Sequence, residues 1–231
     1  MIKLITLLLL FVHLPPAELP GVKVAGAMKN IMMQGDLSTY IDLDTLHKGH
    51  LYGLGPVAGL KGELIILDGI VYSTAKAGKQ LLHQQDKVSQ AAMLVYSYVE
   101  RWKAVSIKAT VSNYAELEKL VETTAKSNGI DTEMPFAFRI EATPVKLDYH
   151  VIDWNEGVAH TMDNHKQFAY TGHVSNTEIS LLGFYSTHHQ SIFTHHTTYM
   201  HLHVLDKKTK TAGHLDDVQI HSTITIYLPE I

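Results

Sequence analysis

The chain has 231 residues, of which 45% are hydrophobic and 18% charged, a composition typical of a protein that folds around its own core. Its 19 basic and 23 acidic side chains give a formal net charge of −4, and the absence of a basic stripe argues against nucleic acid as a partner. Because the sequence contains no cysteine, disulfides, thiolate nucleophiles and thiolate metal sites are excluded, and any metal must bind to imidazoles and oxygens.

The first residues have the character of a secretory signal. A short basic start is followed by an apolar run from residue 4 to residue 14, and small residues stand just before Met28. The apolar run is shorter than the roughly 20 residues that a membrane-spanning helix needs. The sequence therefore predicts a signal peptide at residues 1–27, cleaved after Ala27, and an exported mature protein of residues 28–231 without a membrane anchor.

The first segment of the mature chain carries mixed signals. Residues 28–47 are expected to form one short helix, with Asp42 or Asp44 near its start. This segment contributes little to the interpretation of function.

The next segment has a strong hairpin signal. Asp68 and Gly69 separate two apolar runs, and this dipeptide favours a type I′ turn because both positions adopt positive φ. We therefore predict paired strands at residues 63–67 and 70–73. Further along, residues 93–105 are rich in valine and tyrosine and favour a strand.

The clearest helix lies at residues 113–128. Asn113 is a good N-cap, and Glu116 three residues later is typical of a capping box. From there to the C-terminus most segments alternate or are β-branched, which predicts strands at residues 136–142, 147–153, 168–175, 179–185, 192–205 and 223–228. One helix among many antiparallel strands indicates an α+β domain, with mostly antiparallel β-sheets and few helices.

Histidine is the compositional anomaly. The chain contains 16 histidines, and most of them lie between His150 and His221. His201 and His203 share one face of a strand, because successive side chains of a strand point to opposite faces. The polar segment that follows lets the chain turn back and place His214 beside them. Three converging imidazoles are the protein ligands of a catalytic zinc site.

The spacing alone leaves a second interpretation open. A His-x-His pair in a histidine-rich chain can equally lie on a solvated strand face. The adjacent pairs His188-His189 and His195-His196 point to opposite faces of a strand, so they are poorer ligand pairs. We interpret them as loop or surface residues that can support a neighbouring site. The remaining histidines of this region are interpreted as polar surface: His160, His165, His173 and His221.

Several motifs occur together and in order along the mature chain. They are Gly53-Leu54-Gly55, the segment 62–72 with Glu63 after a glycine, Phe136-Ala137-Phe138-Arg139-Ile140, Gly183-Phe184-Tyr185, and His201-x-His203 followed by Gly213-His214. In this combination the sequence resembles the acetolactate decarboxylase family from about residue 50 to residue 229.

The resemblance implies a fold of two similar β-rich halves and a zinc ion held by His201, His203 and His214. It implies conversion of 2-acetolactate, a small 2-hydroxy-3-keto acid, to acetoin and carbon dioxide. In that reaction the metal acts as a Lewis acid that stabilises the enediolate, and Glu63 takes part in proton transfer. Three imidazoles also suit iron, copper, nickel or cobalt, so zinc is the expectation that the resemblance supplies.

The chain also departs from the family pattern. His150 stands where the family has an arginine near the substrate carboxylate, and Pro56 replaces a threonine. Glu230 is the carboxylate that could take the place of a second family glutamate near the C-terminus. We expect His150 to face the metal cavity and to bind the substrate as an imidazolium, without the two-pronged geometry of an arginine.

Two other functions use the same residues. A metal-dependent ester hydrolase on the same scaffold needs only the metal and Glu63 as a base. A non-catalytic exported protein that binds a metal or ligand agrees with the replaced arginine. Decarboxylation is the leading hypothesis because the resemblance extends along nearly the whole mature chain.

Overall fold

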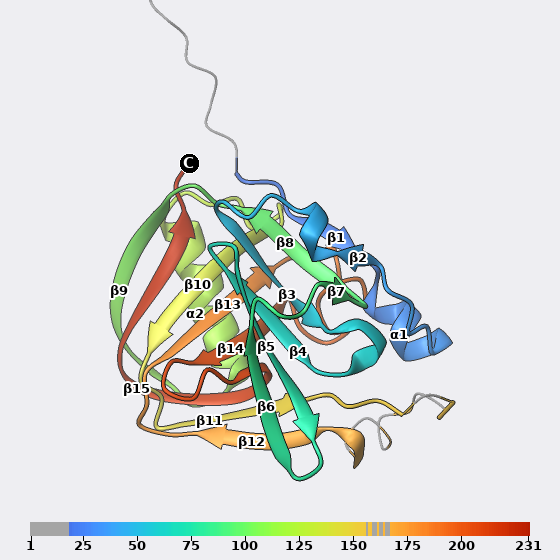
Figure 1. Cartoon of the computed structure of the whole chain (residues 1–231). Coiled ribbons are helices and arrows are strands. Elements are labelled where there is room, and N and C mark those ends of the chain that lie inside the picture. The colour runs from blue at the N-terminus through green and yellow to red at the C-terminus, as the bar shows by residue number, and fades with distance from the viewer. Residues whose placement is uncertain (1–18, 156, 159–160, 162–163, 165–166) are drawn as a thin grey trace, which may run out of the picture.

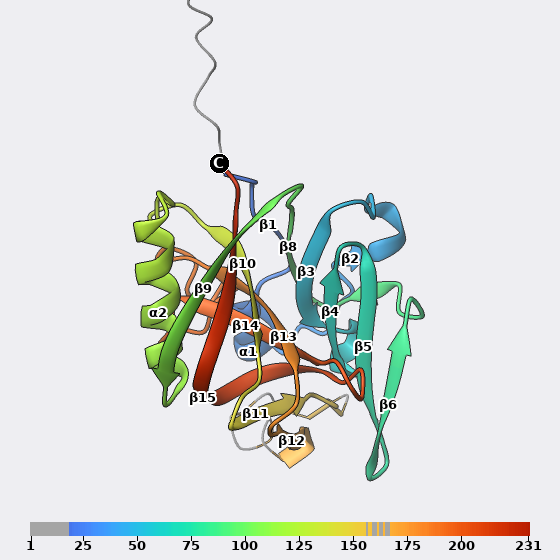
Figure 2. The same ribbon diagram turned by 90° about the vertical axis from the view of Figure 1, so that its left-hand side faces the viewer.

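The computed structural model describes residues 19–155, 157–158, 161, 164 and 167–231. In this part of the chain, two antiparallel sheets face each other, and one long helix covers the outer side of the second sheet (Figures 1 and 2). The arrangement confirms the expected α+β class with mostly antiparallel sheets and few helices.

The first sheet comes from the N-terminal half of the chain. Its six strands lie in the order β1 (Lys23–Ala25), β8 (Leu94–Tyr98), β3 (Leu51–Pro56), β4 (Glu63–Leu67), β5 (Ile70–Ala77) and β6 (Gln80–Gln85). A separate two-stranded sheet pairs β2 (Ile41–Asp42) with β7 (Gln90–Ala91). The sheet therefore uses residues that are close in sequence, mostly as hairpins.

The second sheet comes from the C-terminal half. Its strands are β10 (Phe136–Ala142), β13 (Ile179–Tyr185), β14 (Met200–Asp206), β15 (Ala212–Pro229), β11 (Lys146–Val151) and β12 (Tyr170–Val174), with β9 (Trp102–Val111) paired along β15. The long strand β15 pairs with β14, β11, β10 and β9 in turn. It therefore connects the different parts of this sheet.

Two layers of apolar side chains hold these elements together. Tyr52, Leu54 and Ile65 of the first sheet pack against Leu182 and Phe184 of the second. On the opposite side of the second sheet, buried residues of α2 (Tyr114–Ser127) join the larger cluster: Leu117, Val121 and Ala125. The second sheet is thus covered on both faces, and side chains on its inner face point toward the first sheet.

Local sequence signals account for the best-predicted elements. At the β4–β5 hairpin, Asp68 and Gly69 have φ values of 49° and 79°, as the expected turn requires. At the start of α2, the Asn113 side chain accepts a hydrogen bond of 3.0 Å from the Glu116 amide, and the Glu116 carboxylate accepts one of 2.8 Å from the Ser112 amide. The predicted hairpin and helix are confirmed.

Other boundaries differ from the expectation. Residues 28–47 contain helix α1 (Met28–Gln34), while Asp42 caps a separate 3-10 helix at Leu43–Thr45. The strand expected at residues 93–105 divides into β8 and β9, because the chain passes there from the first sheet to the second. The strand expected from residue 192 begins only at Met200, because the amides of residues 192–194 donate to the His189 carbonyl and form turns.

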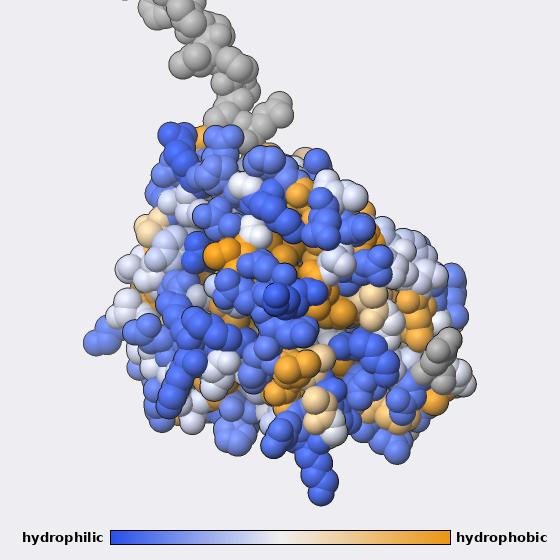
Figure 3. All heavy atoms as spheres, in the orientation of Figure 1, coloured by the Kyte–Doolittle hydropathy of each residue, from blue (hydrophilic) through white to orange (hydrophobic). Residues whose placement is uncertain are grey.

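The expected signal peptide lies mostly outside the described residues, which begin at residue 19. Its last part takes part in the fold: β1 pairs with β8, and the Ser97 hydroxyl donates to the Gly21 carbonyl at 3.1 Å. In the described part of the chain, no helix has the length and apolar character that crossing a membrane would demand. Hydrophilic side chains cover most of the face shown in Figure 3, interrupted by small apolar patches.

Candidate metal and catalytic site

Three neighbouring strands of the second sheet place a row of imidazoles at one level. His203 on β14 is the cross-strand partner of His214 on β15, and His214 is the partner of His150 on β11. Cross-strand partners in an antiparallel sheet project side chains to the same face. The row therefore follows directly from the register of the long strand β15.

His201 completes the group from the same strand as His203. The ring centroids of His201 and His203 lie 5.0 Å apart, those of His201 and His214 5.0 Å, and those of His203 and His214 5.5 Å. The structure thus brings together the three histidines expected to converge. Their assignment as metal ligands stays a prediction.

Each of these histidines has a buried ring nitrogen without a hydrogen-bond partner among the described residues: His201 Nδ1, His203 Nε2 and His214 Nδ1. At His203, Nδ1 lies 2.8 Å from the Leu64 carbonyl oxygen, so Nδ1 donates its proton and Nε2 carries the lone pair. Buried unpartnered nitrogens are costly unless a ligand satisfies them. A divalent metal bound by imidazoles fits this cluster. His201 Nδ1 and His203 Nε2 are its unpartnered donors, whereas His214 Nδ1 lies 3.7 Å from Asp216 Oδ1, which leaves Nε2 as the nitrogen of His214 for the metal.

Burial also keeps these imidazoles neutral. Burial lowers the pKa of both His201 and His203 well below 6.5. A neighbouring imidazole has the next largest effect: His214 lowers the pKa of His201, and His201 lowers that of His203. The pKa of His214 is lowered as well, mainly by burial. A neutral imidazole is the form that binds a metal, so binding at neutral pH displaces few protons.

Glu63 reaches the same place from the first sheet. It begins β4, its side chain is 5% exposed, and its Oε2 lies 3.6 Å from His203 Nε2. Burial raises the pKa of Glu63 to about 7, against the opposing effects of the positive charge of His150 and a hydrogen bond from the Ile152 amide. A carboxyl group with such a pKa can both hold and release a proton near neutrality.

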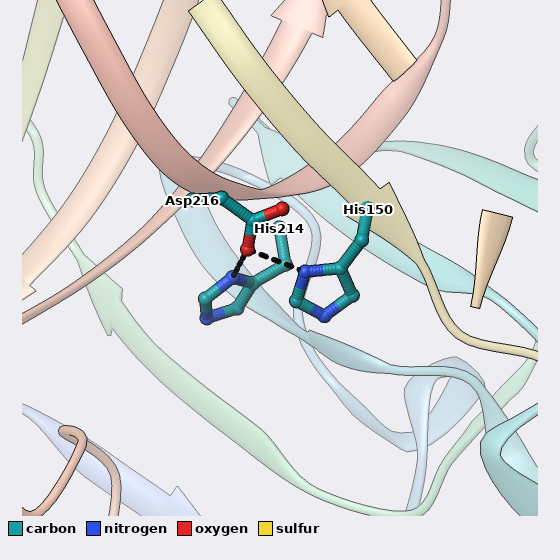
Figure 4. Close-up of side chains that lie close together, drawn as sticks. All are labelled: His150, His214 and Asp216. Carbon is teal, nitrogen blue, oxygen red and sulfur yellow. Dashed lines mark hydrogen bonds and ion pairs between the residues drawn. The ribbon is translucent and has the colours of Figure 1, made fainter. Parts of the chain in front are cut away.

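His150 faces this site, and its side chain is 13% exposed. Its Nδ1 lies 2.6 Å from Asp216 Oδ1, and Figure 4 shows the two side chains beside His214. Burial lowers the pKa of His150, but the hydrogen bond and charge of Asp216 outweigh burial and raise it above 6.5 overall. Asp216 was not expected from the sequence, although its spacing of two from His214 on a strand was the available signal.

These side chains line one end of a cavity of about 840 Å³. The polar end contains Glu63, His150, His201, His203, His214 and Asp216. The remaining wall is mostly apolar and is contributed by α1 and the adjoining segments: Met28, Ile31, Met32, Met33, Leu60, Met93, Ile152 and Ala169. A cavity of this kind, apolar with a few convergent polar groups, is typical of a small-molecule site.

The other residues singled out in the sequence have different places. Pro56, His195 and His196 line the cavity, the two histidines from the loop before β14. His188 lies at the surface, with Nε2 at 3.1 Å from the Glu133 carboxylate. Glu230 forms an ion pair of 3.1 Å with Arg101 Nε at the end of β15. The predictions for His160 and His165 concern positions outside the described residues.

The fold and the site define a class: an α+β protein of two facing antiparallel sheets, with a buried imidazole cluster and a buried carboxyl group in one cavity. The sequence profile of the alpha-acetolactate decarboxylase family matches residues 26–231, and the chain belongs to this family. Family and fold together support a decarboxylase. A comparison with curated protein sequences gives no match.

Solved structures agree on the fold. Acetolactate decarboxylase from Bacillus subtilis subspecies spizizenii superposes with a TM-score of 0.74 at 18% identity, covering 91% of this chain and 87% of the other. For alpha-acetolactate decarboxylase from Bacillus subtilis strain 168, the TM-score is 0.72 at 18% identity, with coverage of 91% and 86%. A Staphylococcus aureus protein of unknown function, similar to alpha-acetolactate decarboxylase, superposes with a TM-score of 0.71 at 15% identity, covering 90% of this chain and 85% of the other.

Proposed function

We propose that this protein is a metal-dependent decarboxylase that converts 2-acetolactate, or a closely related 2-hydroxy-3-keto acid, to acetoin and carbon dioxide. The observation that carries the proposal is the cluster of three buried imidazoles, with ring nitrogens unpartnered among the described residues, beside the buried carboxyl group of Glu63. Membership of the alpha-acetolactate decarboxylase family supports the same reaction.

His201, His203 and His214 are the residues that would hold the metal, with zinc as the expected ion because the resemblance to the family implies it. When bound, the metal supplies Lewis-acid stabilisation of the negative charge that loss of carbon dioxide leaves on the substrate oxygens. The Leu64 carbonyl fixes the orientation of the His203 ring in advance. The protein therefore contributes a rigid set of neutral donors.

Glu63 supplies the proton. When the carbon–carbon bond to the carboxylate breaks, the electron pair stays with the substrate, and the carbon that lost carbon dioxide must gain a proton. The Glu63 carboxyl group, whose pKa burial raises to about 7, donates that proton and is reprotonated from solvent after acetoin leaves. The apolar wall of the cavity limits water at this step.

His150 binds the carboxylate of the substrate. Its ring lines the cavity and is anchored on one side by Asp216, so the rest of the ring is directed to the space beside the imidazole cluster. A single imidazolium gives one charge-assisted hydrogen bond where a guanidinium gives two. We therefore expect weaker substrate binding than an arginine would give at this position.

Replacing His150 tests this role. His150→Ala should raise KM for acetolactate on the order of 10- to 100-fold, the equivalent of about 1.5–3 kcal/mol for a hydrogen bond to a charged group, with a smaller effect on kcat. His150→Arg should keep KM at or below the wild-type value. Steady-state acetoin formation at pH 6 measures both constants. A His150→Ala variant with the KM of the wild type would show that the histidine does not bind the substrate.

The function itself is tested with purified protein and racemic acetolactate, by assaying acetoin. Acetoin formation above the uncatalysed rate is expected. Hydrolysis of an aryl ester without acetoin formation would instead identify a metal-dependent hydrolase, for which Glu63 acts as a base. Metal binding without either activity would indicate a non-catalytic protein that binds a metal or ligand.

We also propose that the protein is exported, on the basis of the signal-like residues 1–27. Cleavage after Ala27 would remove β1 and leave β8 as an edge strand of the first sheet. The chain expressed in a bacterial host with a secretion pathway should appear outside the cytoplasm with Met28 as its first residue. N-terminal mass spectrometry of each fraction measures this, and an uncleaved chain confined to the cytoplasm would contradict the proposal.

A further inference from the structure

Asp216 occupies an irregular position in the second sheet. Along β11 and β15, Tyr149 pairs with Leu215 and Asp148 with Asp217, so β15 has one residue more than β11 at this point. Asp216 is that additional residue. Such β-bulges redirect a side chain and are over-represented next to active sites.

The redirected carboxylate lies between two imidazoles. Asp216 Oδ1 is 2.6 Å from His150 Nδ1 and 3.7 Å from His214 Nδ1. The two rings are 4.6 Å apart between centroids, and Figure 4 shows the same oxygen facing both. One carboxylate oxygen therefore serves the residue expected to bind the substrate and a residue expected to bind the metal.

The group of His150, His214 and Asp216 could itself be taken for a metal site. Its geometry argues against that interpretation. Two ligand atoms that are each about 2.0–2.2 Å from one ion lie roughly 3 Å or more from each other. The 2.6 Å separation of His150 Nδ1 and Asp216 Oδ1 is instead that of a short charge-assisted hydrogen bond.

We propose that Asp216 is a positioning residue that holds the Nδ1 side of both His150 and His214, so that both rings present Nε2 to the cavity. The inference rests on the proposed function for the roles of the two histidines. In Figure 4 the second nitrogen of each ring points away from Asp216. Histidines that bind metals commonly donate their other N–H to a carboxylate, which fixes the ring and strengthens the ligand.

Loss of Asp216 should have two separable effects. His214 loses the carboxylate oxygen that lies 3.7 Å from its Nδ1 and favours a proton on that side of the ring, so metal affinity falls. His150 loses its 2.6 Å hydrogen bond, so the ring no longer has a fixed orientation toward the substrate and KM rises. A residue with a merely structural role in β15 would lower stability without this combination.

The test compares Asp216→Asn with the neighbouring Asp217→Asn as a control. Both variants remove one negative charge from β15, but the Asp217 carboxylate accepts a hydrogen bond of 2.8 Å from the Tyr114 amide at the start of α2. Zinc affinity is measured by competition with a chromophoric chelator. Asp216→Asn should weaken zinc binding by about 10- to 100-fold, the usual effect of losing such a partner, and Asp217→Asn should leave it within about twofold.

A second measurement needs neither metal nor substrate. Nitrogen NMR of the apoprotein labelled with ¹⁵N-histidine reports which ring nitrogens carry protons, and His150→Gln and His214→Gln variants assign the signals. In the wild type, Nδ1 of His150 should be protonated, and Asp216→Asn should lower the protonated fraction of Nδ1 at the same pH. Unchanged zinc affinity together with an unchanged His150 signal would overturn the inference. Changes in both, in a protein that forms no acetoin, would retain the inference and reject the proposed reaction.

Discussion

Replacing His203 with alanine should weaken metal binding on the order of a thousandfold and, with it, lower acetoin formation. His203 is fully buried, and because its Nδ1 is bonded to the Leu64 carbonyl, its Nε2 is the nitrogen directed to the metal, so alanine removes one of the three imidazole ligands. Zinc in protein sites is held by apparent free energies of about 10–16 kcal/mol, so loss of one of three imidazoles should weaken binding on the order of a thousandfold. Equilibrium dialysis with metal analysis measures the loss.

The control is His221→Ala. This histidine is also on β15, at an exposed position opposite Thr110 on β9. It should keep the metal content and turnover of the wild type. Because alanine at position 203 leaves a void in the core, circular dichroism must show that His203→Ala is folded. A folded His203→Ala variant that binds one equivalent of metal with wild-type affinity would contradict the assignment of the ligands.

Replacing Glu63 with glutamine should separate metal binding from turnover. Glutamine keeps the shape of a side chain that is almost completely buried, but it cannot transfer a proton. The variant should retain the metal and lose a factor of about 10² to 10⁴ in kcat. Acetoin formation under saturating substrate, with metal content measured on the same sample, gives both quantities.

Glu133→Gln is the matched control for that experiment. The Glu133 carboxylate is 70% exposed and pairs with His188 at the surface, far less buried than Glu63. Its replacement should leave kcat unchanged. If Glu63→Gln turned over acetolactate as fast as the wild type, proton transfer would have to come from another group.

The properties of the site arise from a common cause. Burial disfavours charge on every group, so it lowers the pKa of His201 and His203 and raises that of Glu63. At neutral pH the imidazoles are therefore free to bind a metal, while the carboxyl group can hold a proton. At His150, the hydrogen bond and charge of Asp216 outweigh the effect of burial and raise the pKa, so this ring can carry a positive charge.

Sequence signals that act over a few residues predicted the local elements well. The Asp68-Gly69 turn and the Asn113 cap specify backbone conformations directly, and β10 and β13 have the boundaries expected from alternation. The two-residue spacing of His201 and His203 placed both rings on one face for the same reason. Local periodicity was sufficient in these cases.

Features that depend on long-range pairing were not predictable in the same way. The bulge that redirects Asp216 exists only because β15 pairs with β11, and no pattern within β15 announces it. The approach of Glu63 to His203 depends on how the two sheets face each other. The resemblance to the family supplied the expectation for Glu63, whereas the available signal for Asp216 was its two-residue spacing from His214 on a strand.

The most direct test of the central claim is a titration of metal-stripped protein with zinc, following acetoin from racemic acetolactate. The rate of acetoin formation should rise in proportion to bound zinc and reach its maximum at one equivalent per chain. Full activity without bound metal, or one equivalent of zinc bound through the three histidines with no acetoin formed, would contradict the claim that this imidazole cluster holds the metal of a decarboxylase.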